Sequence, residues 1–291
     1  MKQRKPNKEL LGGQALLEGV MMKSSSALGL AVYTPQGRLT VQRQEYIPWK
    51  QKYPALGWIF VRGMVNLVEM LLLGVKSLDY AAKIAMPEEY GKQNKYEMPL
   101  SLGLSLLISF GLFIFVPAFS FSRLQSSFSN LLLLNLLEGA LRILIFVVFL
   151  FLVGLSKDMT RIFGFHGAEH MAVYAYEAGE KLTVANVQKY STLHPRCGTS
   201  FLLVVFVVSI VALSLFGRTT LASRLLIKLA LLPVIAGVSY ELIRLVCGLP
   251  RFFSRLILGP GLLLQFLTTR RPDAKMIEAA IAALEAAKGV A

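Results

Sequence analysis

The chain has 291 residues, of which 55% are hydrophobic and 16% are charged. Soluble domains carry about 25% charged residues, and the mean hydropathy of +0.57 is too high for a water-soluble globule of this size. The 23 glycines, 12 prolines and two cysteines exclude collagen, low-complexity disorder and a disulfide-rich secreted scaffold. The composition predicts a mainly α integral membrane protein with attached polar segments.

The formal net charge of +14 would suggest nucleic-acid binding if the chain were soluble. In a membrane protein, basic residues instead gather in cytoplasmic loops and face anionic lipid head groups. No basic segment here interleaves with stacking aromatic residues. We therefore expect membrane lipids as partners and no nucleic acid.

The N-terminal part of the chain differs from the rest. Met1–Glu9 is basic and polar with no apolar run directly after it, so we expect no cleavable signal peptide. Strand-like residues around a Pro/Gly turn predict a β-hairpin near 28–46. The stretch 58–84 is apolar but carries Arg62 and Glu69, which predicts an amphipathic or partly inserted helix.

About four transmembrane helices follow, since four segments approach the roughly 20 apolar residues that a bilayer requires. They run over 98–119, 131–155, 199–216 and 221–246. The shorter stretch 252–267 contains Gly-Pro-Gly and is expected to be re-entrant or interfacial. Residues 273–288 predict an amphipathic helix that Asp273 caps.

The distribution of Lys and Arg predicts the topology. Residues 1–97 hold 14 of them, 156–198 hold five and 247–291 hold six, whereas 120–130 and 217–220 hold one each. This asymmetry puts both termini and the middle loop in the cytoplasm. We therefore expect a cytoplasmic module over 1–97, transmembrane hairpins over 98–155 and 199–246, a cytoplasmic loop region over 156–198, and an interfacial C-terminal segment over 247–291.

All three histidines of the chain fall within 29 residues. His166 and His170 belong to the motif H-x-x-E-H and lie one turn apart on a helix, a spacing that lets two imidazoles bind one metal ion. The same motif in inverted zincins uses its Glu as a general base, a role that Glu169 would take here. Glu177 returns to nearly the same helix face. The alternative is that these histidines simply hydrogen-bond the backbone or lipid head groups.

The third histidine lies in a turn before the third apolar segment. Pro195 favours an extended His194, and Gly179 and Thr183 allow the chain to fold back after the first helix. His194 or Cys197 would then approach the other two histidines. Ligands of this kind favour zinc, with four protein ligands in a structural site and three plus water in a catalytic one.

Ionisable residues inside apolar runs form a second group. Three acidic residues have an arginine at a spacing that keeps both on one helix face. Such residues pair with one another or line a polar cavity, since an unpaired charge in the bilayer is costly. They predict either ion pairs between helices or a path for protons or substrate. Lys228 is expected to extend toward the interface. The group consists of Glu18, Arg62, Glu69, Glu138, Arg142, Glu241 and Arg244.

Several motifs resemble the YqhQ-like family of uncharacterised bacterial membrane proteins. They are Gly12–Met22, Phe165–His170, His194–Ser200, Ser239–Arg244 and Thr268–Pro272. The resemblance covers nearly the whole chain and implies a multi-pass protein of the bacterial inner membrane, described as a predicted metal-dependent enzyme. The family's motif histidines would correspond to His166, His170 and His194, with Glu169 and Cys197 beside them.

Three functional hypotheses remain open. The first is a metal-dependent hydrolase at the cytoplasmic interface, in which Arg161 and Arg196 bind an anionic group of the substrate. The second is a transporter or channel that uses the buried Glu/Arg pairs, for which four spans would require a homo-oligomer. The third is a membrane scaffold with a structural metal ion.

Overall fold

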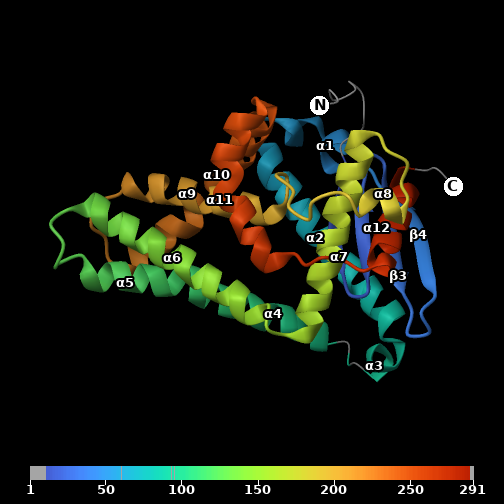
Figure 1. Ribbon diagram of the computed structural model, residues 1–291. Helices are drawn as coiled ribbons and strands as arrows, with labels where there is room; N and C mark the ends of the chain where they lie inside the picture. The colour runs from blue at the N-terminus through green and yellow to red at the C-terminus, as the bar shows by residue number, and fades with distance from the viewer. Residues whose placement is uncertain (1–10, 60, 93, 95, 289–291) are drawn as a thin grey trace.

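The computed structural model describes residues 11–59, 61–92, 94 and 96–288. The basic stretch Met1–Glu9 lies outside them. A small sheet with its covering helices occupies one end of the molecule, and a bundle of long apolar helices extends away from it (Figure 1).

The sheet has four antiparallel strands in sequential order: β1 (Gly12–Leu16), β2 (Gly19–Lys23), β3 (Ala27–Tyr33) and β4 (Leu39–Glu45). β3 and β4 form the predicted hairpin, in which Tyr33 pairs with Leu39. The first two strands were not predicted. Their two-residue turn contains Glu18, whose φ of 54° lies in the left-handed region that residues other than glycine rarely adopt.

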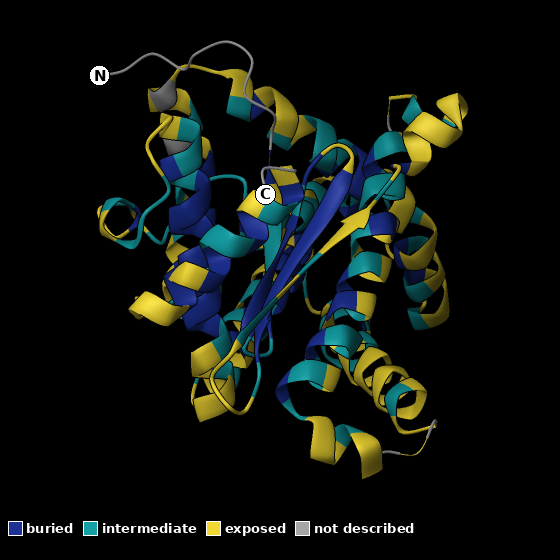
Figure 2. Cartoon of the chain, turned by 90° about the vertical axis from the view of Figure 1, so that its right-hand side faces the viewer, coloured by how far each residue is buried: buried dark blue, intermediate teal, exposed yellow. Residues whose placement is uncertain are grey.

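Both faces of the sheet are covered by helices (Figure 2). One face packs against α7 (Lys157–Ala178) and α12 (Ala274–Lys288), and the other against α2 (Val61–Ala85). Alternate residues point to opposite faces of a strand, so Val20 and Met22 contact the first layer while Met21 contacts the second. Every residue of β3 is therefore buried.

Short helical elements lie between the longer ones, and several helix ends are capped. The elements are α1 (Trp49–Lys52), the 3₁₀ turn η1 (Pro54–Gly57), α3 (Pro87–Lys92) and α8 (Val184–Val187). Gly179 ends α7 in the left-handed conformation, as expected, with φ of 78°. The Thr183 hydroxyl caps α8, and Asp273 Oδ1 accepts a 2.8 Å hydrogen bond from the amide of Met276 to cap α12.

The bundle contains three helices long and apolar enough to cross a membrane. The first is α4 (Glu97–Phe110), which continues through the π-helical segment η2 (Gly111–Phe115) into α5 (Val116–Leu124); the others are α6 (Leu131–Val153) and α10 (Leu221–Gly248). Within these three helices 11–28% of the most apolar window is buried, so most of their side chains face outward. The chain is thus a membrane protein.

The third predicted span, 199–216, is a helix at nearly the expected bounds. It forms α9 (Gly198–Ser214), a 17-residue apolar helix that packs between α6 and α10. The turns after α5 and after α9 meet, since Gln125 Nε2 donates to the carbonyl of Thr219 and Arg218 donates to that of Phe128. Both helical hairpins therefore turn at the same end of the bundle.

The segment expected to be re-entrant or interfacial is a continuous helix, α11 (Arg251–Thr268). Its Pro260 and the neighbouring glycines do not interrupt it. Gly261 allows close packing on α9, because a Cβ there would lie 2.9 Å from the Cα of Ser200. α11 therefore packs along α9, and its C-terminal end lies against α7, next to His166.

Candidate functional site

Helix α7 holds His166, Glu169 and His170 against the sheet. Its two histidines lie one turn apart, with ring centroids separated by 4.4 Å and the rings edge to face at 61°. Two glycines that weaken the helix by propensity allow neighbouring segments to come close. A Cβ on Gly164 would lie 2.6 Å from the sulfur of Met276, and one on Gly167 would collide with the carbonyl oxygen of Arg270.

Backbone carbonyls orient both imidazole rings. His166 Nδ1 lies 2.8 Å from the carbonyl oxygen of Thr268, the last residue of α11, and His170 Nδ1 lies 2.5 Å from that of Thr192. A carbonyl can only accept, so both Nδ1 atoms carry a proton, and in the neutral form of each ring the Nε2 atom keeps its lone pair. Neutral imidazoles in this tautomer are the form that binds metal ions.

Cys197 brings a sulfur ligand to the two Nε2 atoms. Its Sγ lies 3.3 Å from His166 Nε2, and the three potential ligand atoms all lie within 4.8 Å of one another. The turn that begins at His194 closes with a hydrogen bond from the amide of Cys197 to the carbonyl of His194. Cys197 then precedes the first residue of α9, so a helix start and a tight turn together fix its position.

Gln265 of α11 holds this turn in place. Its side chain is fully buried, accepts from the amide of His194 and donates to the carbonyl of the same residue, each at 2.8 Å. It also lies 3.0 Å from the hydroxyl of Ser200. Sequence reasoning missed Gln265, although a single amide inside an otherwise apolar helix is a signal for a buried polar contact.

Glu169 lies beside the three ligand atoms. It is 6% exposed, and one of its carboxylate oxygens is 3.5 Å from His170 Nε2. The carboxylate can reach this place because β1 passes close to α7, with Gly13 where a Cβ would lie 2.8 Å from Glu169 Cγ. Gly13 of β1 thus accommodates an acidic residue beside the sheet.

His194 and Glu177 form a neighbouring group instead of joining the three ligand atoms. His194 Nδ1 accepts from the amide of Arg196, and its Nε2 faces a carboxylate oxygen of Glu177 at 3.9 Å. Arg196 forms an ion pair with Glu177. The rings of His170 and His194 are 5.7 Å apart, so the two groups lie next to each other.

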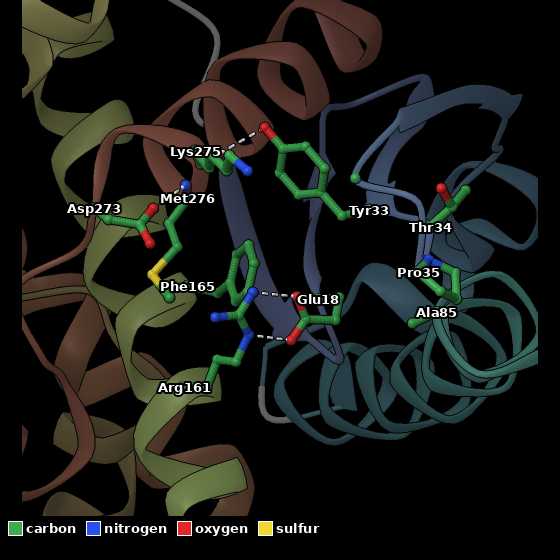
Figure 3. Close-up of a pocket in the computed structure, with 11 residues that line it drawn as sticks. Glu18, Tyr33, Thr34, Pro35, Ala85, Arg161, Phe165, Asp273, Lys275 and Met276 are labelled. Atoms are coloured by element: carbon green, nitrogen blue, oxygen red, sulfur yellow. Dashed lines mark hydrogen bonds and ion pairs between the residues drawn. The ribbon is translucent and has the colours of Figure 1, made fainter.

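Arg161 and Glu18 meet on the side of α7 that faces the sheet. They form a bidentate ion pair at the edge of a pocket of about 420 Å³ between the sheet, α7 and the start of α12 (Figure 3). The hydrogen-bonded carboxylate of Glu18 raises the pKa of the Arg161 guanidinium. In the same pocket, burial and the nearby Glu278 raise the pKa of Tyr33 to about 12.

Two of the expected ion pairs are formed with other partners. Arg62 pairs with Glu241 of α10 rather than with Glu69 of its own helix. Glu69 accepts from the amide of Trp49 at 2.6 Å and lies 3.6 Å from Lys23 Nζ. Seven residues along a helix are two turns, too far for a direct pair, whereas helix packing brings these partners close. Arg244 lies one turn after Glu241 on α10.

Glu138 and Arg142 do approach each other, at 3.8 Å, but in a larger cluster than expected. Glu138 also pairs with Arg224 and Lys228 of α10. Lys228 was expected to extend outward and is instead 5% exposed. Sequence reasoning missed Arg224, since no spacing within one helix reveals a partner on another.

Comparison with known proteins shows the family of the chain. Residues 58–289 match the family described as "Protein of unknown function (DUF1385)". The chain is 30% identical over 288 residues to "Uncharacterized protein YqhQ" of Bacillus subtilis (strain 168), covering 93% of this chain and 89% of the relative. No solved structure matches. The chain therefore belongs to the DUF1385 family of proteins of unknown function, together with its YqhQ relative.

Proposed function

We propose that this membrane protein is a hydrolase that uses a divalent metal ion bound by His166, His170 and Cys197. The observation that supports the proposal is which ring nitrogen of each histidine faces the backbone and which faces the other ligand atoms. Each Nδ1 proton is committed to a backbone carbonyl, so both Nε2 lone pairs are available next to the Cys197 sulfur. Hydrogen bonds of this kind orient the histidine ligands of metal sites and fix their tautomer.

The ligand set favours zinc. Two imidazole nitrogens and one thiolate suit Zn²⁺, whereas Mg²⁺ and Ca²⁺ prefer oxygen ligands. Three protein ligands also correspond to a catalytic rather than a structural site, because catalytic zinc keeps one position open. When bound, zinc supplies a Lewis acid and lowers the pKa of a water in that position.

Glu169 is the proposed general base. Its carboxylate is buried and lies 3.5 Å from a candidate ligand atom, His170 Nε2, so it can accept a proton from a water beside the three ligands. Arg196 directly precedes Cys197 and is the proposed contact for an anionic group of the substrate. On substrate binding, this contact would replace the ion pair that Arg196 forms with Glu177. His194 lies between these groups and completes the polar wall of the site.

We also propose that the protein lies in the bacterial inner membrane with both termini in the cytoplasm. Both helical hairpins turn at the same end of the bundle, and the segments 120–130 and 217–220 at that end carry one basic residue each. The sheet, α7 and α12 lie at the other end, where the basic residues concentrate. The metal site would then open at the cytoplasmic face, with membrane lipids around the bundle.

Elemental mass spectrometry on untagged protein in detergent tests the metal site. We expect about one zinc per chain, lost in the double variant His166→Ala/His170→Ala. His194→Ala is the matched control and should keep its zinc, because His194 lies outside the group of three ligand atoms. A folded wild-type protein without metal, or equal metal in the double variant, would contradict the proposal.

Glu169→Gln separates an enzyme from a scaffold with a structural metal ion. If Glu169 is the base, the variant keeps its zinc and loses about 10²- to 10⁴-fold of its hydrolytic rate on ester, phosphoester or amide substrates. If Glu169 is instead a fourth ligand, the variant loses zinc and melts at a lower temperature.

A further inference from the structure

The apolar bundle buries more positive than negative charge. Glu138 is the single acidic residue between positions 98 and 156, and Glu241 is the single one between 199 and 248, where it pairs with a residue of α2. Arg142, Arg224 and Lys228 are buried around Glu138, with 8%, 0% and 5% exposure. One carboxylate thus faces three cations.

Protonation cannot balance this cluster. Arginine stays protonated in proteins, so Arg142 and Arg224 remain charged under all ordinary conditions. Even a neutral Lys228 would leave two positive charges against the single carboxylate of Glu138. Since an uncompensated buried charge is strongly destabilising, the cluster requires at least one further negative charge.

Two arginine side chains also keep free hydrogen-bond donors. Arg224 uses only its Nη2 atom, which donates to Asn135 Oδ1 and Glu138 Oε2, each at 2.5 Å. Its Nε and Nη1 atoms are buried and meet no acceptor among the described residues. Arg142 donates from Nη1 to Ser209, and its Nε is likewise buried without an acceptor in the described part of the chain.

The surroundings hold these cations in place. The ring of Phe121, fully buried, covers the Arg224 guanidinium at 3.7 Å from its centroid. Lys228 Nζ donates to the carbonyl of Ile114, which belongs to the π-helical segment η2. Segments of this kind occur often at functional sites. Five helical segments, α5, α6, α9, α10 and η2, thus converge on one positively charged cluster.

We propose that this cluster binds an anion, which takes the unused N–H donors of Arg224 and Arg142 and completes the charge balance. The chemistry is that of a halide or a phosphate oxygen, supplied either by a free inorganic anion or by a lipid head group. The almost complete burial of the cations favours a compact free anion. This site is independent of the proposed metal centre on α7.

Anion-dependent stability tests the proposal. The full-length protein is delipidated in a nonionic detergent in sodium gluconate, and chloride, bromide or phosphate is titrated in at constant ionic strength. We expect a saturable rise in melting temperature for the wild-type protein. Arg142→Gln should need at least about tenfold more anion for the same rise. Arg218→Gln, a change in the turn after α9, is the matched control and should behave like the wild type.

A second measurement uses the wild-type protein alone, so it remains valid if Arg142→Gln fails to fold. Wild-type protein should broaden the ³⁵Cl NMR line, and bromide should reverse the broadening. If free anions have no effect but added phosphatidylglycerol raises the melting temperature of the wild type and not of Lys228→Met, the anion is a lipid phosphate. If neither free anions nor phosphatidylglycerol change the melting temperature, and the chloride line is not broadened, the proposal is overturned.

Discussion

The close contact at Gly167 gives a quantitative test of how the candidate site is built. A Cβ at this position would lie within 3.0 Å of the carbonyl oxygen of Arg270, closer than real Cβ atoms come to a neighbour. Ordinary contacts begin at 3.4 Å, so in Gly167→Ala the segment after α11 must retreat by roughly 1 Å. That movement would stretch the hydrogen bond from His166 Nδ1 to Thr268, now 2.8 Å, beyond hydrogen-bonding range.

The expected effect has two parts. Crowding in a packed site costs about 1–3 kcal/mol of unfolding free energy. Loss of a hydrogen bond that orients a histidine ligand lowers metal affinity by about 10- to 100-fold. Denaturant unfolding in detergent measures the first, and competition with a chromophoric zinc chelator measures the second.

Gly198→Ala is the matched control, since it is the same change beside another candidate ligand, Cys197. No atom lies within 4 Å of a Cβ at Gly198, the first residue of α9. The variant should be unchanged or stabilised by up to about 1 kcal/mol, as expected for Gly→Ala in a helix. Equal stability and equal zinc affinity in Gly167→Ala and Gly198→Ala would refute the role given to the Arg270 contact.

Three further predictions concern the elements around the site. Gln265→Leu removes three hydrogen bonds from a fully buried side chain and takes the Gln265 acceptor away from the amide of His194, so the unfolding free energy should fall by about 2–4 kcal/mol; a loss below 0.5 kcal/mol would contradict the role of Gln265 in holding the His194 turn. Asp273→Ala removes the cap of α12 and should cost about 1 kcal/mol, measured by the same denaturant titration, with Asp273→Asn nearly neutral as control. Tyr33 has a folded pKa of about 12 against an ordinary value of 10, so its contribution to stability is complete below pH 10 and is lost as the pH rises to about 12. Phenolate absorbance at 295 nm should therefore show a titration step near pH 12 that is smaller by one tyrosine in Tyr33→Phe, and equal titration curves would count against the pKa assignment.

The helical part of the fold is largely visible in the sequence because membrane insertion depends on local composition. Runs of apolar residues predict α4–α5, α6 and α10, and the Pro/Gly turn at 34–37 predicts the hairpin of β3 and β4. Caps such as Asp273, Thr183 and Gly179 were also recognisable, since each acts within a few residues of its own helix end.

The first two strands were not recognised, because the glycines of β1 carry no strand signal of their own. Gly13 is explained by close contacts with β2 and with α7, since a Cβ there would lie 2.6 Å from the carbonyl oxygen of Met21 and 2.8 Å from Glu169 Cγ. Likewise, the low helix propensity of Gly164 and Gly167 suggested a weak helix, whereas the structure uses both for close packing against Met276 and Arg270. Contacts between distant segments decide such positions.

The polar groups likewise depend partly on local sequence and partly on contacts between distant segments. The one-turn spacing of His166 and His170 follows from the periodicity of a helix, and this is information the sequence contains by itself. Which ring nitrogen is free, and which of His194, Glu177 and Cys197 joins the pair, depends on backbone carbonyls and turns from α9 and α11. The pairing of Arg62 with Glu241 and the gathering of Arg224 and Lys228 around Glu138 likewise depend on helix packing, because partners on different helices have no fixed spacing in the sequence.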